Sequence, residues 1–288
     1  MNNILEAQGL CKHYDAFSLS NISFAVPKGY IMGFIGPNGA GKTTTLKLIL
    51  GVATPAAGHV ELFGERGTLK QNLAQNRRIG VVMDAPLYVD DWTVGEVGSA
   101  LSPFYENWSR ATFAGYLGRL GLDERKKVKE LSRGMRIKLQ IAVALSHDAE
   151  LLVLDEPTSG LDPVARDEIC DLLRGFVEDE NKSVLFSTHI TSDLEKTADY
   201  ITFILNGSIV YTGTKDALFE SYARVTGGLG DIDGTARSLI TGYREHGTGF
   251  EGMIAAEQAG LMPTGVLVEP ISLDEIIIFM HEGAKSNE

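Results

Sequence analysis

The chain has 288 residues, of which 44% are hydrophobic, and carries a formal net charge of -12. This length is enough to bury one large core with a small appendage, or two modest domains. The acidic balance argues against nucleic acid held by broad electrostatic attraction, although it says nothing about a local basic patch. The longest uncharged apolar stretches, such as residues 200–205, fall far short of the ~20 residues that a membrane-spanning helix needs, so a membrane role requires another subunit.

The first predicted elements are strands in which polar and apolar residues alternate. Residues 4–7 and 19–26 show this pattern, and the second segment ends before Pro27 and Gly29. Together they predict an antiparallel β-layer at the start of the chain.

A glycine-rich loop follows an apolar run at residues 30–35 and leads into a helix expected from Thr43 to Leu50. Its glycines let the backbone take positive φ, so that successive N–H groups converge on one anion at the positive end of that helix. Lys42 is expected to reach the β- and γ-phosphates of a nucleotide, and the Thr43 hydroxyl to hold Mg²⁺. The loop therefore predicts a nucleoside triphosphate site. Its candidate nucleotide ligands are Asn38, Gly39, Ala40, Gly41, Lys42, Thr43 and Thr44.

The middle of the chain changes from strands to helices. After predicted strands at 59–63 and 79–83, the helical pattern begins at Trp92 and predicts a helical subdomain at about residues 88–148. Its expected helix N-caps are Thr93, Ser109 and Ser132.

Near-continuous aliphatic runs return at residues 151–154 and 184–187, which is typical of buried parallel strands. Asp162 caps and Pro163 opens the helix expected between them. Asn206-Gly207 then predicts a tight hairpin.

A domain boundary is expected near residue 224, where the sequence becomes glycine-rich. It separates a large domain, residues 1–224, from a small C-terminal extension, residues 225–288. The extension shows a candidate strand at 265–268 and a helix at 273–281. The predicted fold class is α/β: a phosphate-loop NTPase core with a mainly parallel sheet, an N-terminal antiparallel β-layer, a helical subdomain and a small α/β extension.

Two carboxylates follow the buried run at 151–154, at the sheet edge where open α/β folds bind their ligands. Asp155 is expected to hold Mg²⁺, directly or through water, and Glu156 to orient a water for in-line attack on the γ-phosphorus. Acidic residues also end strands simply because turns are polar. The phosphate loop upstream favours the catalytic interpretation.

The order of these motifs resembles the ATP-binding subunits of ATP-binding cassette transporters, over roughly residues 4–213. Leu131-Ser132-Arg133-Gly134-Met135 resembles the family signature, and Ser159-Gly160-Leu161-Asp162 the loop through which two subunits communicate. His189 resembles the switch histidine that contacts the γ-phosphate. Tyr14 resembles the aromatic residue that stacks on adenine; taken alone, a tyrosine at this position is more often a plain surface residue.

The resemblance implies that two copies pair head to tail across ATP and Mg²⁺. The phosphate loop, Asp155 and Glu156 of one copy then face Ser132 and Gly134 of the other, because one chain cannot fold this helix start onto its own phosphate loop. Asp162 is counted among the nucleotide-binding residues, and Glu156, His189 and Lys42 among the catalytic ones. Hydrolysis would open the dimer and move a separate transmembrane permease subunit.

Two motifs depart from the family pattern. Asp84 stands where the family usually has a glutamine, and it is either a ligand of Mg²⁺ or water, or merely a loop acid. Arg133 and Met135 replace the more usual glycine and glutamine of the signature. Arg133 adds positive charge beside the γ-phosphate, whereas Met135 is expected to pack against the partner or the core.

The function expected from these motifs is that of an ATPase subunit driving a separate membrane exporter of drugs, peptides or lipid-like molecules. It is expected at the cytoplasmic face of the membrane, with no nucleic-acid partner. The alternative is a soluble cassette ATPase acting on DNA or ribosomes; the single phosphate loop and the short interval between Lys42 and Asp155 argue against it. A small-molecule phosphotransferase would need no signature helix.

Overall fold

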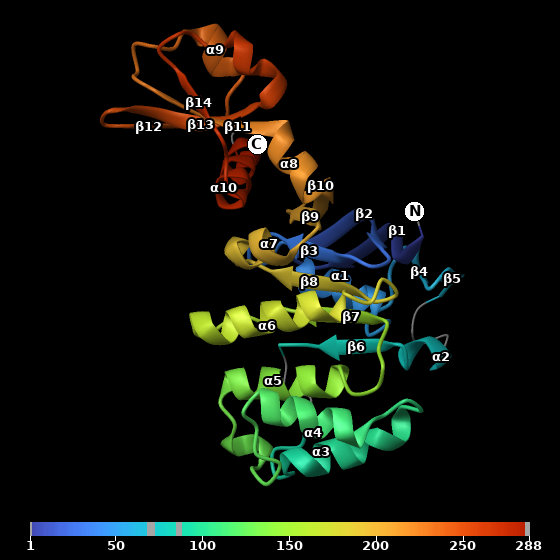
Figure 1. Ribbon diagram of the computed structural model, residues 1–288. Coiled ribbons are helices and arrows are strands. Elements are labelled where there is room, and N and C mark those ends of the chain that lie inside the picture. Colours follow the sequence, from blue (N-terminus) through green and yellow to red (C-terminus); the bar gives the residue numbers. More distant parts are fainter. Residues whose placement is uncertain (1, 68–72, 85–87, 286–288) are drawn as a thin grey trace. The chain divides into compact units, whose positions relative to one another are not determined.

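A computed structural model describes residues 2–67, 73–84 and 88–285 (Figure 1). Contacts between residues divide the chain into two compact units, Met1–Thr212 and Gly213–Glu288, which are described separately below. Across the described residues, no helix combines the length and the apolar character that crossing a membrane requires.

A six-stranded sheet forms the centre of the first unit. Its strands are β3 (Ile31–Ile35), β6 (Ile79–Val82), β7 (Leu151–Asp155), β8 (Ser183–Thr188), β9 (Tyr200–Leu205) and β10 (Ser208–Thr214). They follow the order β10-β9-β3-β8-β7-β6, and the pairs from β9 to β6 are parallel. Every residue of β3, β7 and β8 is buried, as expected for parallel strands covered on both faces. The aliphatic runs therefore predicted parallel strands correctly.

A second, antiparallel sheet forms the N-terminal layer. It contains β1 (Asn3–Tyr14), β2 (Phe17–Pro27), β4 (Ala57–Leu62) and β5 (Glu65–Arg66), in the order β2-β1-β4-β5. One core cluster joins this layer to α1 (Lys42–Ile49) and to the central sheet. Phe24 of the layer, for example, stacks on Phe34 of β3 with ring centroids 5.2 Å apart. The predicted antiparallel β-layer is confirmed, and its strands are longer than the alternation indicated.

Helices of the first unit gather mainly between β6 and β7 in the sequence. Between these strands lie α3 (Val94–Leu101), the short η1 (Ser102–Phe104), α4 (Arg110–Arg119), η2 (Val128–Glu130) and α5 (Arg133–Ala144). The short α2 (Leu73–Asn76) precedes β6, and α6 (Pro163–Phe176) and α7 (Thr191–Thr197) follow β7 and β8. Figure 1 shows α3, α4 and α5 grouped together, and α5 packs along β6. The three predicted N-caps are confirmed, because Thr93, Ser109 and Ser132 each accept a backbone hydrogen bond at a helix start.

The hairpin between β9 and β10 is hydrogen-bonded to both the glycine-rich loop and β2. Asn206 and Gly207 both have positive φ, 47° and 75°, as the tight turn predicted from their sequence requires. The Gly207 N–H donates to the Ala40 carbonyl of the glycine-rich loop at 3.1 Å, and its carbonyl accepts from the Ser20 N–H of β2 at 2.9 Å. A Cβ at position 207 would overlap the Ser18 carbonyl oxygen, so this bridge depends on glycine.

The second unit is built on a four-stranded antiparallel sheet of order β12-β13-β11-β14. Its elements are α8 (Lys215–Ser221), β11 (Tyr222–Gly227), α9 (Gly234–Ser238), β12 (Thr241–His246), β13 (Gly249–Ala255), η3 (Ala256–Leu261), β14 (Leu267–Glu269) and α10 (Leu273–Lys285). The sequence predicted only the last strand and helix, because the glycines of β11, β12 and β13 interrupt the alternation. The boundary expected near residue 224 falls inside β11.

Truncation of Phe34 should strongly destabilise the first unit. Its side chain is fully buried against Phe24, so Phe34→Ala leaves a cavity and should lower the free energy of unfolding by about 3–5 kcal/mol. Phe104→Ala is the matched control, because that side chain is 69% exposed, and it should change stability by less than about 0.5 kcal/mol. Urea denaturation followed by circular dichroism measures both. Equal losses would contradict the assigned core.

Candidate functional site

The glycine-rich loop forms an open cradle between β3 and α1. Gly39 and Gly41 take positive φ of 81° and 112°, which other residues rarely adopt. A Cβ on Gly39 would meet no atom within 4 Å, whereas one on Gly41 would overlap the side chains of Phe17 and Leu19. The loop is therefore open at Gly39 and closely packed at Gly41, at the N-terminus of α1 where anions bind favourably.

Lys42 lies beneath this cradle with only 6% of its side chain exposed. Its ammonium group donates to the backbone carbonyls of Gly36 and Pro37, at 2.7 and 3.3 Å. It also lies 3.3 Å from Oε1 of Glu156. A buried ammonium needs such partners, and all of them can be exchanged for phosphate oxygens.

Asp155 ends β7 as a buried carboxylate with both oxygens engaged. Thr43 Oγ1 donates to Oδ2 at 2.7 Å, and Ser187 Oγ donates to Oδ1 at 2.6 Å. The second contact follows from the parallel register, in which Asp155 lies opposite Ser187 of β8. The sequence assigned no chemistry to Ser187; the predicted pairing of the two aliphatic strands was the signal that could have revealed it.

Glu156 follows directly in a strained backbone conformation, with φ at 52°. Its N–H donates to the Ser187 carbonyl at 3.0 Å, which holds this turn against β8. Its Oε2 lies 2.7 Å from Nδ1 of His189, while Oε1 faces Lys42. The structure thus brings three predicted catalytic residues together around one carboxylate.

These side chains open onto a pocket with a volume of about 630 Å³, within the range of small-molecule sites. The pocket is lined by Ala16, Phe17, Asn38, Gly39, Gly41, Lys42, Thr43, Thr44, Asp84, Arg133, Glu156, Ser159 and His189. Ala16 and Phe17 were not predicted. Tyr14 does not line this pocket; it is 49% exposed, and it pairs with Phe17 at the turn between β1 and β2.

The signature residues Ser132 and Gly134 also do not line the pocket. Ser132 is exposed and caps α5, where its hydroxyl accepts from the Met135 N–H at 3.2 Å. Gly134 packs against Leu161, since a Cβ there would come within 2.7 Å of that side chain. The start of α5 and the loop before α6 therefore form one contiguous surface.

Asp162 is engaged as the N-cap of α6, as predicted. Its Oδ1 accepts from the N–H groups of Val164 and Ala165, both at 3.0 Å. These bonds, led by that of Ala165, hold the pKa of the Asp162 carboxyl below its usual range. The carboxylate therefore stays ionised where it caps the helix.

Asp84 has a partner that neither sequence interpretation included. Its Oδ1 lies 2.5 Å from Nη2 of Arg133, so the two departures from the family pattern form one ion pair. Just before it, the Gln140 amide accepts from the Met83 N–H at 2.9 Å and donates to the Met83 carbonyl at 3.0 Å. Asp84 is thus held at the pocket by the end of β6.

Comparison with known proteins agrees with this geometry. A family model described as ABC transporter matches residues 19–159. The Nod factor export ATP-binding protein I of Burkholderia orbicola (strain AU 1054) is 38% identical over 215 residues, 73% of this chain and 70% of that protein. The bacitracin transport ATP-binding protein BcrA of Bacillus licheniformis is 34% identical over 73% of this chain and 69% of its own length.

A solved structure of an ATP-binding subunit of an ABC transporter superposes with a TM-score of 0.65 at 28% identity, covering 75% of this chain and 91% of that one. The chain belongs to the ATP-binding subunits of ATP-binding cassette (ABC) transporters. As a member of this family it binds ATP and hydrolyses it. The predicted family and the predicted α/β fold class are both confirmed.

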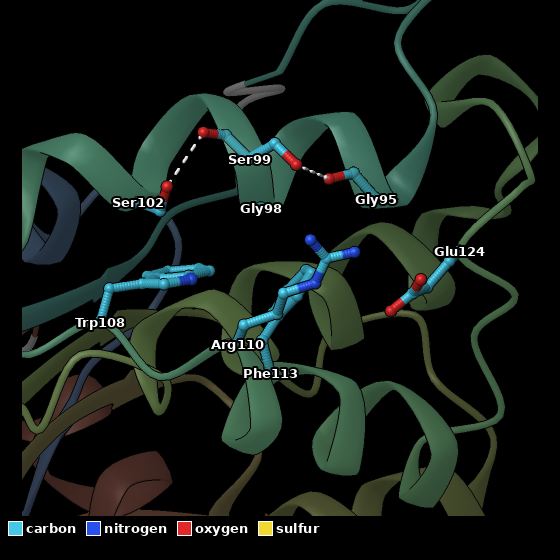
Figure 2. Close-up of a pocket in the computed structure, with 8 residues that line it drawn as sticks. All are labelled: Gly95, Gly98, Ser99, Ser102, Trp108, Arg110, Phe113 and Glu124. Carbon is cyan, nitrogen blue, oxygen red and sulfur yellow. Dashed lines mark hydrogen bonds between the residues drawn. The ribbon is translucent and has the colours of Figure 1, made fainter.

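The helical part of this ABC ATPase contains a second, smaller pocket of about 150 Å³, shown in Figure 2. It lies between α3 and α4, where Trp108 and Phe113 have ring centroids 5.3 Å apart. Arg110 and Glu124 also line it. The aromatic residues of this helical part thus divide into two sets: Trp108 lines the pocket, whereas Trp92 and Phe104 are exposed.

Ser187 should position Asp155 and Glu156 for hydrolysis. Ser187→Ala removes the donor to Asp155 Oδ1, so the ATPase turnover number should fall about tenfold, with a smaller change in ATP affinity. Steady-state kinetics and fluorescent-ATP binding measure the two effects.

Ser183→Ala is the matched control for this variant. Ser183 is another buried serine of β8, and its hydroxyl accepts from the Gly29 N–H, away from the pocket. Its turnover number should stay within about twofold of wild type. Equal losses in the two variants would reduce Ser187 to a general structural role.

Proposed function

We propose that this chain is the ATPase subunit of a bacterial exporter and works as a head-to-tail dimer against a separate transmembrane permease. The observation that carries the proposal is the division of the predicted site. Lys42, Glu156 and His189 share one pocket, whereas Ser132 and Gly134, on either side of the first residue of α5, do not line it. A second copy can supply that helix start to the open side of the cradle.

ATP hydrolysis in this pocket assigns a task to each residue. Lys42 exchanges its contact with Glu156 for the β- and γ-phosphate oxygens, which frees the carboxylate. Glu156 then orients the attacking water and takes its proton as the bond to the β-phosphate oxygen breaks, leaving ADP and phosphate. His189 turns from Glu156 to the γ-phosphate. Loss of that phosphate opens the dimer.

Thr43 and Asp155 fit the role of Mg²⁺ ligands, since their oxygens lie 2.7 Å apart at the base of the cradle. When bound, Mg²⁺ neutralises charge that develops on the phosphates. Asp84 faces the same pocket, but its carboxylate is engaged by Arg133. We therefore assign Mg²⁺ to Thr43 and Asp155.

The direction of transport and the class of cargo are inferred from relatives. Similar proteins include ATP-binding proteins named for Nod factor export, bacitracin transport and lantibiotic transport. These names support export of a peptide, drug or lipid-like molecule. The subunit then lies at the cytoplasmic face of the membrane, bound to its permease.

Glu156→Gln should trap an ATP-bound dimer. The phosphate cradle is intact in this variant while the water loses its acceptor, so turnover should fall at least about a hundredfold. Light scattering at saturating ATP with Mg²⁺ should report a dimer for Glu156→Gln. The double variant Glu156→Gln/Ser132→Arg should stay monomeric, because the arginine crowds the exposed helix start. A monomer in both cases would overturn the dimer proposal.

The exposed aromatic residues of the helical part should contact the permease. Trp92 lies just before α3 and is 39% exposed. A cysteine placed there should therefore form a crosslink to a membrane-spanning subunit through a short bifunctional reagent. Leu267→Cys, 62% exposed in β14, is the matched control and should form none. Wild type reports the background of Cys11 and Cys170. A crosslink from the cysteine at position 267 and none from position 92 would mean that the second unit, and not the helical part, contacts the permease.

A further inference from the structure

Each lysine or arginine that lines the ATP pocket is paired with a carboxylate of the same pocket. Lys42 faces Glu156 at 3.3 Å, and Arg133 faces Asp84 at 2.5 Å. The first pair joins α1 to the end of β7, and the second joins the start of α5 to the residue beyond β6. The Arg133–Asp84 pair thus repeats, at another wall of the pocket, the arrangement found around Lys42.

The two ion pairs differ in how easily a phosphate can replace the carboxylate. Arg133 and Asp84 have 55% and 53% of their side chains exposed, compared with 6% and 16% for Lys42 and Glu156. Exposed ion pairs contribute little to stability because water screens them. A guanidinium binds phosphate through two parallel N–H bonds, which is a stronger interaction than a single contact with an exposed carboxylate. A phosphate that enters the pocket can therefore displace Asp84 from Arg133.

The surroundings of Arg133 direct its side chain into the pocket of its own chain. Gly160, with φ at 75°, presents no side chain beside the guanidinium: a Cβ there would lie 3.5 Å from Nη1. Gln140 fixes the backbone of Met83 and so the position of Asp84. Ser132 and Gly134, on either side of Arg133, do not line this pocket. The signature is therefore divided between its own pocket and the surface offered to a second copy.

We propose that Arg133 is a nucleotide-binding residue of its own subunit, and that Asp84 holds its guanidinium at the pocket until a triphosphate replaces the carboxylate. This inference rests on the proposed function, because it takes ATP as the ligand of the pocket. Arg133 binds the polyphosphate before any dimer forms. Asp84 competes with the nucleotide, so it sets the affinity of the isolated subunit.

The test measures nucleotide affinity in the monomer, where a residue that acts only on a partner's ATP has no effect. Fluorescent ATP and ADP are titrated into the full chain at a concentration at which light scattering reports a monomer. Arg133→Gln should weaken ATP binding about tenfold, and Asp84→Asn should tighten it about threefold. The effects should be smaller for ADP, which carries less negative charge.

The double variant isolates the pair. In the Arg133→Gln background, Asp84→Asn should change ATP affinity by less than about 1.5-fold, because the guanidinium it would release is gone. Arg136 and Asp90 supply the control: they form an ion pair at 3.3 Å one turn along α5, and neither lines the pocket. Arg136→Gln and Asp90→Asn should each leave affinity within about 1.5-fold of wild type.

Each outcome bears on one claim. A wild-type chain that binds no ATP contradicts the proposed function itself. A wild type that binds ATP, with Arg133→Gln unchanged, overturns only the role of Arg133 in its own subunit. If Arg136→Gln and Arg133→Gln weakened ATP binding equally, the effect would come from the net charge of the protein and not from a contact of Arg133 with the nucleotide. If the changes in ATP affinity caused by Arg133→Gln and Asp84→Asn simply added in the double variant, Asp84 would not compete with the nucleotide for Arg133.

Discussion

The parallel pairing of β3, β7 and β8 is the constraint on which the rest of the site depends. Their register places the ends of all three strands at one sheet edge, with Asp155 opposite Ser187. The phosphate loop, the two carboxylates and His189 all follow directly from those ends. A shift of one residue in β7 would turn Asp155 away from Ser187 and carry Glu156 out of reach of His189. Every residue of β7 and β8 is buried, so the same strands supply both the aliphatic core and the residues of the site.

The charged side chains of the pocket are paired with one another or with hydroxyl groups. Lys42 and Arg133 each face a carboxylate, and Asp155 accepts two hydroxyl hydrogen bonds, so these charged groups have partners before a ligand arrives. A buried charge without a partner is costly. The contacts of the buried Lys42 and Asp155 therefore stabilise the site, and together with the exposed pair of Arg133 and Asp84 they make binding an exchange: each phosphate contact replaces one that exists already. Affinity then depends on the difference between the two sets of contacts rather than on the sum of the new ones.

The sequence predicted the parts of the site that depend on local patterns, and it missed those that depend on distant contacts. The phosphate loop, the helix N-caps and the hairpin at Asn206-Gly207 each have a local signal, and the structure contains them. The contact between Arg133 and Asp84 joins residues 49 positions apart through the packing of α5 on β6, which no spacing rule reveals. Ser187 was hidden for the same reason. In the second unit, glycines at positions 227, 242, 249 and 252 obscure the alternation of three strands, so the sheet could not be predicted there.

The bridge at Gly207 has a consequence for how the glycine-rich loop responds to a nucleotide. A loop with this many glycines has large conformational freedom, and a ligand that had to order it would lose affinity to that entropy. Here Gly207 holds Ala40 by a hydrogen bond and is itself tied to Ser20 of β2, while Gly41 packs against Phe17 and Leu19. The loop is thus held in place by its contacts at Ala40 and Gly41 and is open to a ligand at Gly39. Much of its ordering entropy is lost when the protein folds rather than when ATP binds, which leaves more of the binding energy available for the pairing of subunits that we propose.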